Sequence, residues 1–209
     1  MAMMAVWCSF GWKKVNMIAK TLAQLAVQLN RFLRQNFKLA EDIALVSNLN
    51  EADGSACTHA NNKLVLFLVG IEKESASRQN PSLLDTGFSR SANSAPALHL
   101  NLYVMLAANF NGANYTDALT LLSASISFFQ RNPLFTQQNL PELDPAIERL
   151  VLDMENLNIQ DASNLWGMLS GKYLPSVLYK VRMVSFDGAD IYSQSSLLSK
   201  PVSDIGSRL

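Results

Sequence analysis

Apolar residues at the start of the chain recur at steps of three and four positions, which is the spacing of one face of an α-helix. Between residues 17 and 37 polar residues fill most of the other positions, so the pattern predicts an amphipathic helix. At about 1.5 Å per residue this helix would be roughly 30 Å long, enough to cross a sheet. Its apolar stripe consists of Ile18, Leu22, Leu25, Leu29, Leu33 and Phe37.

Two shorter helices are predicted further along the chain. Asn114 is a plausible N-cap and Asp117 an acidic residue in the first turn, so a helix should run from there to about Gln130, where Asn132-Pro133 follows. Asn158 should cap another helix that continues to Leu169. The expected buried stripes are Leu119, Leu122, Ile126 and Phe129 in the first, and Ile159, Ala162, Leu165, Trp166 and Leu169 in the second.

Other segments alternate between apolar and polar residues, which predicts strands. Residues 97–106 and 176–186 alternate clearly, and residues 148–155 fit the same pattern in part. Residues 63–71 form a continuous apolar run, typical of a central strand covered on both faces. Residues 43–49 read as a further strand, and the Asp53-Gly54 turn signal after it predicts a hairpin with a long tip to residues 63–71.

Three segments fall outside this pattern. Residues 72–96, about 25 positions rich in Ser, Asn, Arg and Gly, predict a long polar loop that is ordered by a partner. Residues 1–16 read as an N-terminal extension, and residues 188–209 as a C-terminal arm with several apolar side chains. The domain between them, residues 17–187, has the order α-β-β-β-α-β-α-β. It therefore predicts an α+β fold: one mainly antiparallel mixed sheet of about five strands with helices packed on it.

The composition narrows the possible functions. Lysine and arginine (17) balance aspartate and glutamate (17), and only 16% of residues are charged against 49% apolar. A thinly charged surface fits a protein that buries much of itself against neighbours, although a globular monomer with a polar surface is the alternative. A nucleic-acid binder would need a basic excess, so we expect no nucleic-acid partner. We find no membrane-span pattern and no secretory signal, and expect synthesis in a bacterial cytoplasm.

Residues capable of catalysis or metal binding are few. Cys57 and His59 alone supply at most half a zinc site, and the other cysteine, Cys8, is far away in the sequence. His99 lies between leucines in a predicted strand, where packing or an interface is favoured over catalysis. The segment from Gly167 to Lys172 is one residue too short for a phosphate-binding loop and lacks its Ser or Thr. We therefore predict no enzyme activity, no cofactor and no metal.

One stretch resembles a family signature. It reads Leu165-Trp166, then Gly171-x-Tyr173-x-Pro175-Ser176, then Tyr179-x-Val181-Arg182. With collinear blocks at residues 69–72, 96–107, 115–119 and 128–133, it resembles the cap, or tail-terminator, proteins of extracellular contractile injection systems. These are phage-tail-like particles of the antifeeding-prophage type. The resemblance covers about residues 17–187; residues 1–16 have no counterpart in it, and His99 stands where another residue type is expected.

The resemblance implies a structural function. Family members form a six-fold ring on the last sheath and inner-tube layers, at the end opposite the baseplate, and stop further polymerisation. The partners expected here are thus other copies of the chain, the sheath and the tube, within a particle released from the cell. The alternatives are another tail component, such as a baseplate or tube adaptor, an assembly chaperone, and less favourably a small-ligand-binding domain or enzyme.

Several residues are expected at these protein interfaces. Trp166 could be an interface anchor, but its place on an amphipathic helix favours a core position. Lys180 and Arg182 share a strand face that is either solvated or meets an acidic partner. The C-terminal arm is expected to add main-chain hydrogen bonds to a neighbouring subunit. The complete set of candidate interface residues is Arg78, Arg90, Lys172, Tyr173, Lys180, Arg182, Ile191, Tyr192, Leu197 and Leu198.

Overall fold

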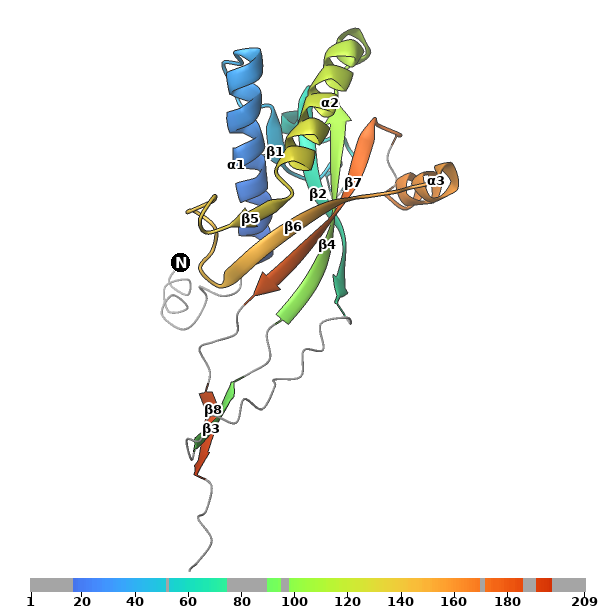
Figure 1. The fold of residues 1–209 in the computed structure, drawn as a ribbon. Helices are drawn as coiled ribbons and strands as arrows, with labels where there is room; N and C mark the ends of the chain where they lie inside the picture. The colour runs from blue at the N-terminus through green and yellow to red at the C-terminus, as the bar shows by residue number, and fades with distance from the viewer. Residues whose placement is uncertain are drawn as a thin grey trace, which may run out of the picture.

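A computed structural model describes residues 17–51, 53–74, 90–94, 98–169, 172–185 and 191–196 (Figure 1). The predicted N-terminal extension, most of the polar loop and the end of the C-terminal arm lie outside the described residues. The helices are α1 (Met17–Phe37), α2 (Tyr115–Arg131) and α3 (Ile159–Met168), with short 3-10 turns η2 (Thr58–Ala60) and η3 (Gly112–Asn114). The strands are β1 (Ala44–Val46), β2 (Lys63–Lys73), β3 (Arg90–Ser94), β4 (Leu98–Asn109), β5 (Leu134–Thr136), β6 (Ile147–Glu155), β7 (Ser176–Ser185) and β8 (Ile191–Ser196).

The main sheet has six strands in the order β1-β2-β4-β7-β6-β5. Every neighbouring pair in it is antiparallel except β1 and β2, which run parallel. The predicted α+β class with one mainly antiparallel mixed sheet is therefore confirmed, and each strand predicted from the pattern exists. The sheet has one strand more than expected because β5, only three residues long, is too short to show alternation.

The predicted hairpin between residues 43–49 and 63–71 is wrong. Ala44 lies in register with Leu64 in a parallel pair, so the connection must cross over the sheet before β2 begins. The turn at Gly54 does form, with φ of +82°, but it closes only a small loop in which the Glu51 N–H donates to the Ser55 carbonyl. A local turn signal thus was correct, while the strand pairing inferred from it was not.

Helices α1 and α2 cover one face of the sheet (Figure 1). The α1 stripe is confirmed in its centre, where Leu25, Leu29 and Leu33 are almost fully buried. The rings of Phe32 and Phe128 stack between the two helices with centroids 4.9 Å apart. In α2 the predicted stripe is partly wrong. Leu119 is 39% exposed, and the buried positions are Ala118, Leu121, Leu122, Ser125 and Phe129.

A smaller core lies on the opposite face of the sheet. It contains Cys57 and Ala60 from the β1–β2 connection, Trp166 from α3, and side chains from the central strands. In β2, Leu64 and Leu66 therefore face the larger core while Val65 and Phe67 face the smaller one. This double coverage confirms β2 as the central strand predicted from its unbroken apolar run.

Strands β3 and β8 form a separate two-stranded antiparallel pair, in which Arg90 lies opposite Ser196. β3 precedes β4 in the chain and β8 follows β7, so the pair extends the direction of the β4–β7 ladder (Figure 1). One end of the predicted polar loop is therefore paired with part of the predicted C-terminal arm. Among the described helices, none is long and apolar enough to cross a membrane.

Candidate interaction surface

Exposed apolar side chains lie on and beside helix α3, next to the predicted interface residues Lys172 and Tyr173. Asn158 starts the helix, since its Oδ1 accepts a hydrogen bond of 2.8 Å from the Asp161 N–H, as predicted. Only Trp166 is buried among the residues of the helix, at 4% exposure, in the smaller core. Of the two readings of Trp166, the core position is therefore the one found. The indole packs α3 onto the sheet, together with the partly buried side chains of Leu165 and Leu169.

Other apolar side chains on and beside α3 point away from the core. Ile159 is 91% exposed and Met168 69% exposed, while Leu157 just before the helix is 37% exposed. Tyr173, which follows the helix, is 70% exposed and packs the edge of its ring against Trp166, with centroids 6.0 Å apart. We call Leu157, Ile159, Met168 and Tyr173 the α3 surface.

An open groove of about 350 Å³ runs beside this surface, between α3 and the strands beneath it. Its lining is almost entirely apolar and includes Val69, Tyr103, Leu157, Leu165, Met168 and Leu178. Large apolar groups that remain exposed together on a folded domain commonly mark a protein–protein contact. The geometry suits burial of apolar side chains from a partner.

The sequence predicted this surface only in part. Lys172 and Tyr173 were candidate interface residues, and both are exposed beside α3. The prediction that Ile159 is buried is wrong. It is the first residue of α3, where an apolar side chain fits the stripe pattern whether the first turn meets the core or extends beyond it. Leu157 and Met168 were not singled out, and their sequence pattern carries no signal that distinguishes exposure from burial.

Lys180 and Arg182 are held by partners within the chain. Arg182 forms an ion pair with Asp153 on the neighbouring strand β6. The ammonium of Lys180 lies 5.7 Å from the centre of the Tyr103 ring. The Tyr103 hydroxyl donates a 2.9 Å hydrogen bond to Glu72, and this bond together with burial raises the pKa of the tyrosine. Both cations therefore contribute to cross-strand contacts, each half-buried at the surface of the sheet.

The remaining candidate residues lie in β3 and β8 or outside the described residues. Arg90 is the first residue of β3, and Ile191 and Tyr192 begin β8. Arg78, Leu197 and Leu198 lie outside the described residues. His99 lies in β4 opposite Val184 and is half-buried. The structure therefore brings Lys172 and Tyr173 together with α3 and places Arg90 near β8 through strand pairing, while Lys180 and Arg182 belong to the sheet.

The comparison with protein families decides the relationship. Residues 21–200 match the model of the Pvc16 N-terminal domain. The chain belongs to the Pvc16 N-terminal domain family. The match extends over most of α1, over α2, α3 and the six-stranded sheet, and it includes the β3–β8 pair. No curated protein sequence matches the chain.

A solved structure shares the fold of this Pvc16 N-terminal domain. The sheath/tube terminator in the extended state of PVC, an extracellular contractile injection system, superposes with a TM-score of 0.55 at 16% identity. The alignment covers 92% of this chain but 65% of that terminator, so the chain spans less than two thirds of its length. The tube-terminating cap of the anti-feeding prophage has a TM-score of 0.44 at 16% identity, with 87% of this chain and 58% of that one covered. The predicted relationship to tail-terminator proteins is confirmed.

Proposed function

We propose that this protein is a structural cap that terminates the sheath and inner tube of a contractile injection particle at the end away from the baseplate. The observation that carries the proposal is the family match over residues 21–200, together with the fold shared with the PVC sheath/tube terminator. Its role is to occupy a surface, without chemistry. A terminator needs one surface that docks as the next subunit would and another that offers no further site.

Copies of the chain assemble into a six-fold ring with sheath and tube as its other partners. A closed ring repeats one heterologous contact by rotation, so two different surfaces of the same domain must meet. The α3 surface supplies one of them, because Leu157 and Met168 expose apolar side chains along the groove. Ile159 and Tyr173 are exposed at the start of the same helix and just after its end. The low charged fraction of 16% reduces the desolvation cost of such a contact.

The loop of residues 72–96 and the arm of residues 188–209 act together as a docking extension of the central domain, residues 17–187. Pairing of β3 with β8 supports this, because it joins a part of the loop to a part of the arm. In a two-stranded pair each strand keeps one edge whose backbone groups another chain can bond. The extension would add main-chain hydrogen bonds to a neighbouring cap or sheath subunit at such an edge.

Electron microscopy of particles with a labelled N-terminal tag on this chain tests the proposal. We expect the label at one end only, opposite the baseplate. Label along the shaft or at the baseplate would instead favour another tail component. Free protein with no label on finished particles would favour an assembly chaperone.

The same labelling experiment tests the α3 surface. Replacing Ile159 and Met168 together by aspartate puts two charges where apolar side chains should be buried against a partner. We expect at least about tenfold less label on particles, since central apolar anchors dominate interfaces. Circular dichroism should show an unchanged fold because both side chains are exposed. Val27→Asp on α1, at a position 45% exposed, is the matched control and should retain label. Equal label for the double variant and the wild type would show that the α3 surface is not an interface in the particle.

A further inference from the structure

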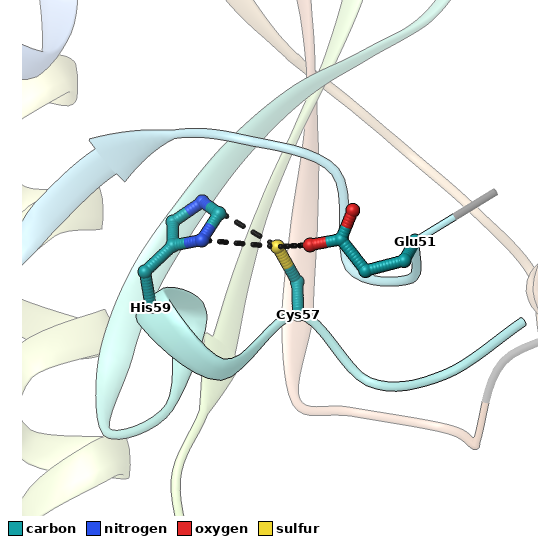
Figure 2. Close-up of side chains that lie close together, drawn as sticks. All are labelled: Glu51, Cys57 and His59. Atoms are coloured by element: carbon teal, nitrogen blue, oxygen red, sulfur yellow. Dashed lines mark hydrogen bonds between the residues drawn. The ribbon is translucent and has the colours of Figure 1, made fainter. Parts of the chain in front are cut away.

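Three side chains of different chemistry meet in the β1–β2 connection: Glu51, Cys57 and His59 (Figure 2). The backbone of this connection brings them together. The Cys57 N–H donates to the Leu49 carbonyl at 3.0 Å, and the small loop around Gly54 returns the chain so that Glu51 faces the cysteine. The 3-10 turn η2 then places His59 on the other side of the sulfur (Figure 2).

The distances between the three groups are short. The Cys57 Sγ lies 3.0 Å from Oε1 of Glu51 and 3.2 Å from Nδ1 of His59. One donor atom from each residue lies within 4.8 Å of the others. Within the described part of the chain, this is the only group of three such side chains close enough to share a metal ion.

We propose that Glu51, Cys57 and His59 form a Zn²⁺ site that staples the β1–β2 connection, with water as the fourth ligand. A thiolate, an imidazole and a carboxylate are the three ligand types that zinc accepts in proteins. Calcium and magnesium prefer oxygen ligands alone, so the cysteine and histidine disfavour both. The site is independent of the capping role proposed above.

To hold the ion, the two exposed side chains must turn toward each other around the Cys57 sulfur. Tetrahedral bonds of about 2.3 Å to sulfur and about 2.0 Å to nitrogen or oxygen separate these donors by roughly 3.5 Å. The Cys57 sulfur must therefore move away from the other two donors by roughly half an ångström or less. The Glu51 oxygen and the His59 nitrogen lie on opposite sides of the sulfur and within 4.8 Å of each other, and they must rotate toward each other. Cys57 is fixed in the smaller core at 3% exposure, whereas Glu51 and His59 are exposed and free to shift. The cysteine provides a rigid anchor to which two adjustable ligands close.

Ser47 supplies the outer contact that metal-binding histidines commonly have. Its Oγ lies 2.8 Å from Nε2 of His59. When Nε2–H donates to this hydroxyl, the lone pair belongs to Nδ1, the nitrogen nearer the Cys57 sulfur. Ser47 thus favours the tautomer in which His59 coordinates through Nδ1.

Without an ion the thiol of Cys57 donates to Glu51, and this hydrogen bond, with burial, raises the pKa of the cysteine. Zinc binds the thiolate, so its binding must release the Cys57 proton to solvent. Affinity should therefore increase with pH. The sequence alone predicted no metal, because Cys57 and His59 are two ligands at most and only the turn around Gly54 brings Glu51 to them.

Titration of the chelator-treated, full-length protein with Co²⁺ and then Zn²⁺ tests the proposal. We expect one Co²⁺ per chain, with the near-ultraviolet absorption of a cobalt–thiolate bond and visible bands of a tetrahedral ion, both removed by Zn²⁺. Cys57→Ser should abolish the thiolate band, and Cys8→Ser, the matched control, should retain it. His59→Ala should weaken zinc binding at least about 100-fold and Ser47→Ala about tenfold.

The His59 side chain is exposed, so His59→Ala should fold normally. This variant therefore tests the proposal even if Cys57→Ser fails to fold. No saturable Co²⁺ absorption would mean that the three side chains form a hydrogen-bonded loop cluster only, and would overturn the proposal. Equal zinc affinity for the wild type and His59→Ala would overturn it as well. Loss of the thiolate band in Cys8→Ser would assign the bound metal to the other cysteine and have the same consequence.

Discussion

Replacing Trp166 with alanine is expected to lower the free energy of unfolding by about 3–5 kcal/mol. The indole is 4% exposed and is the one buried side chain of α3, so its loss leaves a cavity in the smaller core and detaches the helix. Urea unfolding followed by circular dichroism measures the loss without relying on tryptophan fluorescence. Relative to the wild type, hydrogen exchange in the Trp166→Ala variant should also accelerate more in α3 than in α1.

Met168→Ala is the control for this variant. Its side chain belongs to the same helix but is 69% exposed, so we expect a change within about 0.5 kcal/mol. A loss below about 1 kcal/mol in Trp166→Ala would contradict the conclusion that the indole holds α3 to the sheet. The result bears on function, because the α3 surface keeps its shape only while Trp166 remains in place.

Asn30→Ala is expected to cost about 3 kcal/mol or more, because three hydrogen bonds between α1 and β1 are lost. The Asn30 side chain is 7% exposed. Its Nδ2 donates to the Ala44 carbonyl at 2.7 Å, and its Oδ1 accepts from the N–H groups of Ile43 and Ala44 at 3.0 and 2.8 Å. In Asn30→Ala, the Ala44 carbonyl and the N–H groups of Ile43 and Ala44 would lose these hydrogen bonds, and Ala44 is buried. Urea unfolding again measures the change.

Asn36→Ala provides the matched control on the same helix. Its Nδ2 donates to the Phe32 carbonyl at 2.8 Å, but in an exposed position where water can replace it. The change should remain within about 0.5 kcal/mol. Equal destabilisation by the two alanine variants would show that Asn30 does not fix β1 as its contacts indicate.

These contacts explain why β1 could not be placed from the sequence. The three-residue strand owes its position to one asparagine of α1 and to a parallel partner, and neither contact is encoded by residues near it in the chain. The Asp53-Gly54 signal was read correctly as a turn, but a turn signal does not state which strands it joins. By contrast, α1 was predicted to its ends because its stripe repeats over 21 residues.

The same reasoning applies to the interaction surface. Tyr173 could be predicted because a family signature specifies it, whereas Lys172 lies at an unspecified position within that signature. The contact of the Tyr173 ring with Trp166 is visible only in the structure. Ile159 could not, since the apolar stripe of a helix does not state how far the core beneath it extends. The zinc ligand Glu51 depends on a backbone reversal whose outcome is visible only in three dimensions.

Negative-stain electron microscopy of particles from cells that lack this protein tests the central claim most directly. The length distribution of the tails is compared with that from cells producing the wild-type chain. Termination by this domain predicts over-long or widely variable tails, restored to uniform length when the chain is supplied again. Tails of normal, uniform length in its absence would contradict the account.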